Sequence, residues 1–434
     1  MLETLKNALK TKEIRIKILL TLAFLLVYRI GCYIPVPGLD STEMANIFSD
    51  DFLGILTSMS GGSLQNATLF SLGILPFINA FIIMQLLTLV IPKLEKLSKE
   101  GDAGRRKITQ ITRYLALGLA AVQGIGVVVG WRKAVNPVFS FEAGWDAPYL
   151  TMASIIIILM AGSTMVMWLG ERITEYGIGN GTSLIIFVGI LAQAGATMGN
   201  ALTVVAEENW TYIWNVLGFI IIVFAIFAFI VFIDLAERRV TVQYSKQIKG
   251  NKMYGGQTTY IPIRVNGSGV MPIIFASSLL MFPQMIMVLF APNSEAYAWY
   301  ATHMGSGTWV YYVLLAVFIL FFSYFYAQIQ FNPEDVSKNI QQYGGFIPGI
   351  RAGKPTSDFL KKISNRITLF GAIFLMVIAL VPTFIFIALD QSGILGFNSA
   401  FSATGLLIVV SVALELNKQL ESQIMMKHYK GFLK

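Results

Sequence analysis

The stretch YIWNVLGFIIIVFAIFAFIVFI, residues 212–233, decides the fold class. It contains no charged side chain, and an α-helix needs about 20 such residues to cross the ~30 Å hydrocarbon core of a bilayer. Composition extends this conclusion to the whole chain, because 55% of the 434 residues are hydrophobic and only 13% are charged. Ordinary soluble domains contain about 25% charged residues. The sequence therefore predicts an all-α integral membrane protein.

Similar apolar runs recur along the chain, and together they predict ten transmembrane helices. Two related halves in one bundle fit this number better than the roughly three soluble domains that length alone suggests. The predicted spans are Ile16–Ile34, Leu69–Ile91, Ile108–Gly130, Met152–Gly170, Ser183–Ala201, Tyr212–Ile233, Val270–Ala291, Trp309–Ile329, Ile367–Leu389 and Phe397–Leu416.

Lysine and arginine predict the orientation, because they favour the cytoplasmic side of a membrane. Of the 32 Lys and Arg residues, 29 lie in alternate connections and in the two terminal segments. The connections on the other side contain only Arg132 and Lys133, and Arg29 lies near the outer end of the first span. Both termini are therefore expected in the cytoplasm. The net charge of +8 follows mainly from this topology, so we expect no DNA partner.

The residue types of most catalytic and metal sites are scarce. Cys32 is the only cysteine, which excludes an intrachain disulfide, and His303 and His428 are the only histidines. No HExxH or GxxxxGK[ST] motif occurs, and Gly177–Gly181 (GIGNG) lacks the spacing of a dinucleotide loop. We expect no enzyme activity, no metal site and no cofactor. Residues Met1 to Arg15 do not resemble a cleavable signal peptide, so the first apolar run is retained as a span.

Two spans combine proline with polar residues, and each is the second span of its half. Proline frees a backbone carbonyl that lipid cannot satisfy, so such segments should face protein or a water-filled cavity. Paired interrupted helices often mark a substrate path, although proline and small polar residues are also common in membrane helices generally. The residues are Pro76, Asn79 and Gln85 in one span, and Pro272, Ser277, Ser278 and Pro283 in the other.

The segment Phe52–Leu64 (FLGILTSMSGGSL) is apolar but too short to cross the bilayer. It precedes the second span on the predicted external side. Two interpretations remain open at this point: a re-entrant segment, or a helix that lies on the outer surface.

The two largest cytoplasmic connections, Leu235–Arg264 and Phe331–Arg366, are longer and more basic than topology requires. The second contains a Gly/Pro-rich tip, Gly344–Pro355 (GGFIPGIRAGKP), which should turn tightly and project Arg351. These connections form either a docking platform for a large partner or merely solvated charged loops.

The spans favour a passive conduit over a secondary carrier for a small solute. Ion-coupled carriers use buried carboxylates, whereas Asp234 and Glu415 lie close to the cytoplasmic ends of their spans. Ile74 and Ile78 lie one helical turn apart, and Ile274 lies at a similar depth in the seventh span. A collar of such side chains can exclude ions by dewetting, although paired isoleucines are also ordinary in helix packing.

Five segments of the chain closely resemble the SecY family, whose members form the channel subunit of the bacterial Sec protein translocase. The resemblance covers essentially the whole chain, and the external connections and C-terminal tail match least. The segments are Phe70–Leu87 (FSLGILPFINAFIIMQLL), Gly101–Tyr114 (GDAGRRKITQITRY), Trp168–Gly181 (WLGERITEYGIGNG), Val265–Ser278 (VNGSGVMPIIFASS) and Phe331–Gly353 (FNPEDVSKNIQQYGGFIPGIRAG).

The resemblance implies an hourglass of two pseudo-symmetric five-helix halves, residues 1–203 and 204–416, followed by a cytoplasmic tail, residues 417–434. A ring of aliphatic side chains would form its waist, with threonine in place of the usual aliphatic residue at position 182. This substitution implies a slightly wetter constriction. By motif position the ring would be Ile74, Ile78, Thr182, Ile186, Ile274 and Ile408.

The same resemblance implies that residues 52–64 form a plug helix beneath the ring. A lateral gate would open between spans two and three and spans seven and eight to release signal sequences into lipid. The implied residues are Phe52, Leu53, Ile55, Leu56, Met59 and Leu64 for the plug; Asn79, Gln85, Ser277 and Ser278 for the gate; and Arg351, Lys246, Lys249 and Lys252 for docking of a motor or ribosome.

The implied function is passage of unfolded secretory polypeptides across the bacterial cytoplasmic membrane, and release of hydrophobic segments into it. Because the chain has no nucleotide site, the driving force would come from the SecA ATPase or from a translating ribosome. The small membrane subunits SecE and SecG would accompany it.

Overall fold

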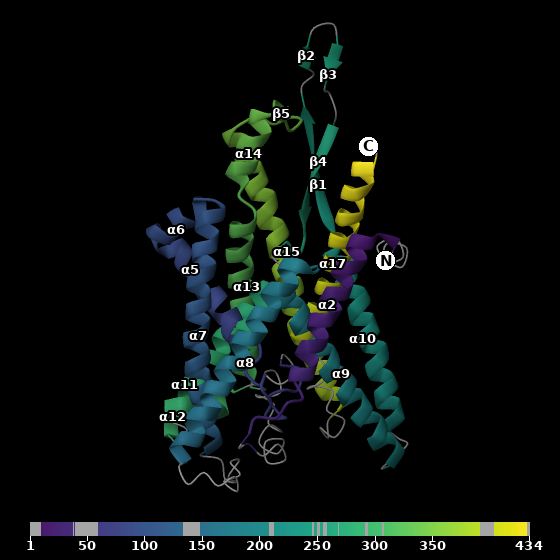
Figure 1. Cartoon of the computed structure of the whole chain (residues 1–434). Coiled ribbons are helices and arrows are strands. Elements are labelled where there is room, and N and C mark those ends of the chain that lie inside the picture. Colours follow the sequence, from purple (N-terminus) through teal and green to yellow (C-terminus); the bar gives the residue numbers. More distant parts are fainter. Residues whose placement is uncertain are drawn as a thin grey trace.

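The computed structural model describes residues 10–37, 39, 60–132, 148–207, 212–244, 247–249, 252–254, 258–267, 269–290, 294–305, 308–390 and 403–431. Long helices run side by side through most of its height, and a group of strands stands at one end (Figure 1). The helices are α2 (Lys12–Gly31), α5 (Leu75–Val90), α6 (Pro92–Lys99), α7 (Asp102–Arg132), α8 (Pro148–Tyr176), α9 (Gly181–Glu207), α10 (Ile213–Asp234), α11 (Met271–Phe290), α12 (Glu295–Met304), α13 (Trp309–Gln330), α14 (Pro333–Gln342), α15 (Lys354–Leu389) and α17 (Ala403–Gly431).

Each predicted span coincides with a helix of the structure, namely α2, α5, α7, α8, α9, α10, α11, α13, α15 and α17 in chain order. By length and hydropathy, six helices among the described residues can each cross a membrane, or seven if the bent pair α5 and α6 counts as one span. Helix α10 shows the surface expected in lipid, since Ile221, Phe224 and Phe232 are 67%, 68% and 72% exposed. The all-helical membrane fold class is confirmed, and the number of crossings stays a prediction.

Several helix bounds differ from the predicted span boundaries; α17, for example, extends to Gly431, well beyond the expected end at Leu416. The second span was expected to begin at Leu69, but α5 begins at Leu75, because residues 69–74 form turns in which Gly73 has φ +55°. The ninth span was expected to begin at Ile367, whereas α15 extends continuously from Lys354 to Leu389. Its first three turns therefore continue the membrane helix into the predicted 331–366 connection.

Strands form within the two long connections, which sequence analysis did not predict. Strand β1 (Glu237–Tyr244) pairs antiparallel with β4 (Thr258–Arg264) and, on its other edge, with β5 (Gly345–Phe346). A second hairpin, β2 (Gln247–Lys249) and β3 (Lys252–Tyr254), lies at the far tip (Figure 1). The sheet β4–β1–β5 therefore joins both connections into one unit, whose apolar core includes Val242, Ile340 and Leu360.

The two halves of the bundle meet on two sides. On one side α9 packs against α17 and α10, and on the other α7 packs against α11. The start of α2 and the end of α17 lie towards the end of the bundle that carries the strands, which we call the strand end (Figure 1). This arrangement agrees with an even number of crossings.

Candidate functional site

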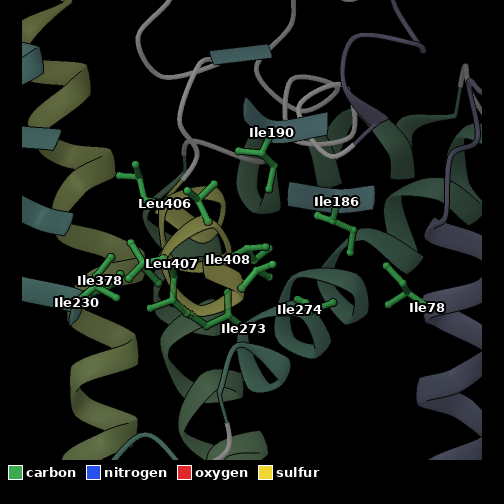
Figure 2. Packing of buried hydrophobic residues seen from close by; sticks show 14 of the residues in the cluster. Ile78, Ile186, Ile190, Ile230, Ile273, Ile274, Ile378, Leu406, Leu407 and Ile408 are labelled. Carbon is green, nitrogen blue, oxygen red and sulfur yellow. The ribbon is translucent and has the colours of Figure 1, made fainter. Parts of the chain in front are cut away.

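A cavity of about 1030 Å³ lies between the two halves. Its walls come from α5, α7, α8 and α9 of the first half and from α11 and α17 of the second. Five of the six predicted ring residues line this cavity, namely Ile78, Thr182, Ile186, Ile274 and Ile408. Figure 2 shows Ile78, Ile186, Ile274 and Ile408 converging from four different helices. The structure thus brings together residues that are distant in sequence.

The position of Ile78 and Ile274 follows from the way their helices begin. Pro76 is the second residue of α5, and Pro272 is the second residue of α11. Proline is favoured in a first helical turn, where its missing N–H has no partner to lose. The expectation that these two prolines interrupt their spans was therefore wrong: they start the helices, and Pro283 is the proline that remains inside α11.

Ile74 and Thr182 differ from the other predicted ring residues. Ile74 precedes α5 as its cap residue and is 4% exposed, but it does not line the cavity. Thr182 lines it with a half-buried side chain, and its backbone N–H donates to Asn180 Oδ1 at 3.1 Å. The threonine therefore adds a hydroxyl to the lining, beside the polar residues Asn180 and Ser183.

Two polar side chains of α5 each carry an oxygen atom without a hydrogen-bond partner among the described residues. Asn79 is 9% exposed, and its Oδ1 accepts no hydrogen bond from any described residue; the same holds for Gln85 Oε1, and Gln85 lines the cavity. By contrast, the Ser277 hydroxyl donates to the Ile274 carbonyl at 3.1 Å, and Ser278 is half-buried. Sequence analysis missed Ser323 on α13, which is 1% exposed and whose Oγ also has no partner in the described part of the chain.

The predicted plug is described only at its end. Phe52, Leu53, Ile55, Leu56 and Met59 lie outside the described residues. Leu64 is buried in a cluster with residues of α7 and α8, apart from the cluster that contains the ring isoleucines.

A buried polar turn forms the described end of the predicted plug segment, and sequence analysis did not predict it. Gly61 and Gly62 have φ +67° and +84°, values that favour glycine. Arg29 Nη1 donates to the Gly61 carbonyl at 3.0 Å, and its Nη2 donates to the Tyr33 hydroxyl at 2.9 Å. The Ser63 carbonyl accepts from Thr68 and Ser71 hydroxyls, both at 3.1 Å. The outlying arginine of the first span thus fixes this turn to α2.

We call the two strand-bearing connections, residues 235–264 and 331–366, the strand unit. The predicted docking residues that the structure describes lie on it. Arg351 is exposed, and its carbonyl accepts from Thr356 Oγ1 at 2.8 Å between turns at Gly349 (φ +83°) and Gly353 (φ +97°). Lys249 and Lys252 are paired directly across the β2–β3 hairpin, and Lys246 lies outside the described residues. The tip turns as expected, and β5 links it to β1.

Charged residues line the cavity towards the strand end. Arg113 Nε donates to Glu171 Oε1 at 2.7 Å and joins α7 to α8, while Arg172 Nη1 contacts Glu175 Oε2 at 2.6 Å. Arg105 lines the same part. This part of the lining is therefore polar, whereas Ile78, Ile186, Ile274 and Ile408 make another part of it aliphatic.

Comparison with known proteins identifies the family. The SecY family model matches residues 68–417. The chain belongs to the SecY family. Similar relatives include the protein translocase subunit SecY of Streptomyces galbus, 43% identical over 450 residues with 100% of each chain covered, and that of Mycobacterium bovis, 39% identical over 449 residues with the same coverage. Membership supports the conduit over the carrier.

Solved structures of channels share the fold. One, described as a protein conducting channel, has a TM-score of 0.62 at 20% identity and covers 94% of this chain and 92% of its own. Another, the canine Sec61 channel in complex with the ribosome, has a TM-score of 0.57 at 19% identity with the same coverage. At these identities the likeness concerns the fold alone.

Proposed function

We propose that this chain is a protein-conducting channel, through which unfolded secretory polypeptides cross the bacterial cytoplasmic membrane. One observation carries the proposal: five ring residues from α5, α9, α11 and α17 line a single cavity between two halves that touch on either side of it. A polypeptide in this cavity would pass the collar formed by Ile78, Ile186, Ile274 and Ile408.

The collar limits leakage at rest by its chemistry. A narrow constriction with aliphatic walls excludes ions because water does not fill it readily, and it can widen for a larger solute. Thr182 offers a hydrogen-bonding group in the same lining, so we expect this collar to be wetter than an all-aliphatic one. Ile74 would support the collar from behind, and residues 52–64 would seal it as the plug.

The seam between α5 and α7 of the first predicted half and α11 and α13 of the second, which meet where α7 packs against α11, serves as the lateral gate. Buried polar atoms without partners, such as Asn79 Oδ1 and Ser323 Oγ, each destabilise the closed arrangement by about 1–3 kcal/mol. A hydrophobic signal helix that enters the seam changes the packing partners of these helices and lets the polar groups find water or the passing chain. We include Gln85, Ser277 and Ser278 in this gate.

The strand unit is the docking surface for the driving partner. Arg351 is exposed on it, and the lysines of the β2–β3 hairpin extend it away from the bundle. In this proposal the strand end and both termini face the cytoplasm, and SecA or a translating ribosome binds there. SecE and SecG complete the membrane complex, and the chain itself catalyses no reaction.

Reconstitution tests the proposal. The chain is purified with the small subunits, placed in vesicles and supplied with SecA, ATP and an unfolded precursor. Protease protection of the precursor inside the vesicles is expected only when SecA is present. Uptake of a small solute without SecA, and no protection of the precursor, would instead support a carrier.

A further inference from the structure

The strand unit is connected to the pore by a very short segment. Strand β4 ends at Arg264 and α11 begins at Met271, and Val270, Met271 and Ile274 already line the cavity. We call residues 265–270 the connector. If the sheet is displaced, either the connector changes conformation or the start of α11 moves with the sheet.

The connector is held at its first two residues. The Val265 N–H donates to the Ala236 carbonyl at 3.0 Å, which continues the contact between the strand ends. Asn266 is 6% exposed, and its Nδ2 donates to Asp234 Oδ1 at 2.7 Å. On the other side, α15 approaches so closely at Gly371 that a side chain there would collide with the Val265 carbonyl. The first two residues of the connector, Val265 and Asn266, therefore cannot move independently of their neighbours; Ser268 lies outside the described residues.

Asp234 links the connector to a second pore helix. Its other carboxylate oxygen, Oδ2, accepts from Ser411 Oγ on α17 at 3.4 Å. Ser411 lies three residues after Ile408, so it is one helical turn from a ring residue. One carboxylate thus contacts both the segment that leads to Ile274 and the helix that carries Ile408.

The location of this carboxylate is unfavourable for α10 on its own. Asp234 is the last residue of that helix, where the helix dipole disfavours a negative charge. Asn266 Oδ1 also has no partner in the described part of the chain although the residue is buried. The contact therefore leaves one buried acceptor unsatisfied, which is unfavourable for this position of the connector.

We propose that Asp234 is a positioning residue that transmits partner binding at the strand unit to the pore ring, through Asn266 and the start of α11. The inference rests on the proposed channel function. In this inference the Asp234–Asn266 pair couples docking of the partner to opening of the channel. The pair takes no part in docking itself. Removing the pair should leave partner binding intact and weaken its effect on the channel.

The test compares Asp234→Ala, Asn266→Ala and the double variant in SecA-driven vesicles. Each single variant should bind SecA within about twofold of wild type yet transport precursor at least about tenfold more slowly, because coupling between sites typically amounts to about 5–150-fold. The double variant should be no slower than Asp234→Ala, since that single change already removes the Asp234–Asn266 contact. Asp234→Asn retains an acceptor oxygen and should restore most of the rate.

Asn215→Ala is the matched control. Asn215 Nδ2 donates to the Leu389 carbonyl at 2.9 Å and joins α10 to α15 at its other end, away from the connector. This variant should transport at the wild-type rate. Three results would overturn the inference. Asn215→Ala could slow transport as much as Asn266→Ala does, or the double variant could be slowed by the product of the two single effects. Alternatively, transport could fall only in proportion to lost SecA binding. If wild-type vesicles transport nothing, the channel function itself fails, which is a different result.

Discussion

Ile78 and Ile274 occupy the same position in their helices: each lies two residues after a proline in the first turn, and each lines the cavity. Proline in the first turn fixes where a helix begins, because its φ is already helical. Because the isoleucine follows that start at a constant spacing, its position along the helix is also fixed. In both predicted halves, a proline in the first helical turn therefore places an isoleucine of the cavity lining two residues later.

The lining at position 182 should control the resting leak. Thr182→Ile completes the aliphatic collar and is expected to lower the ion conductance of idle vesicles several-fold, because a drier constriction admits fewer ions. Ile186→Thr replaces a collar isoleucine with a hydroxyl-bearing residue and should raise the conductance. Equal ion conductance of the wild type and both variants would mean that this lining does not determine the ion seal.

The buried amide of Asn79 should set the stability of the gate. Asn79→Leu replaces an acceptor that lacks a partner, so the closed seam should gain about 1–3 kcal/mol. Export should then require a more hydrophobic signal sequence, measured with a graded series of signals. Ser277→Ala removes a hydroxyl that is satisfied within its own helix and should leave the threshold nearly unchanged. An unchanged threshold in Asn79→Leu would contradict this role.

Arg351 should be needed for partner-driven transport. Arg351→Glu reverses the charge of an exposed side chain at the docking tip, so we expect the protein to insert stably while SecA-dependent export is lost. Lys361→Glu makes the same charge change at an exposed position of α15 and serves as control. Normal export by Arg351→Glu, or equal loss in both variants, would remove the assignment.

Gly61 should tolerate no side chain. A Cβ there would lie 2.9 Å from Gly189 Cα, and the residue has φ +67°. Gly101→Ala is the matched control, since Gly101 has φ +78° but no atom within 4 Å of the added Cβ. The free energy of unfolding of the control should fall by only about 1–2 kcal/mol, the cost of a non-glycine residue in a left-handed conformation. Thermal unfolding in detergent should show a clearly larger loss for Gly61→Ala, whereas equal losses would mean that the turn adjusts freely.

Helix positions were predictable because hydropathy acts along the chain. The ring residues were predicted from the family motifs, and five of the six line the cavity, while their role as a ring stays a prediction. The turn at Gly61 and its contact with Arg29 could not be predicted, since their hydrogen bonds join residues far apart in sequence. Strand β5 was missed for a similar reason: Gly345 and Phe346 gain their conformation from pairing with β1. The partnerless oxygens of Asn79 and Gln85 also became visible only in three dimensions.

Crosslinking at Ile78 tests the central claim most directly. In a chain with Cys32 replaced by serine, a cysteine is introduced by Ile78→Cys, and a secretory precursor is stalled during SecA-driven transport. The matched control is Ile221→Cys on the exposed face of α10, 67% exposed. The account predicts a strong crosslink from position 78 and none from position 221. A stalled precursor that is protected by the membrane yet crosslinks at neither position 78 nor position 274 would contradict it.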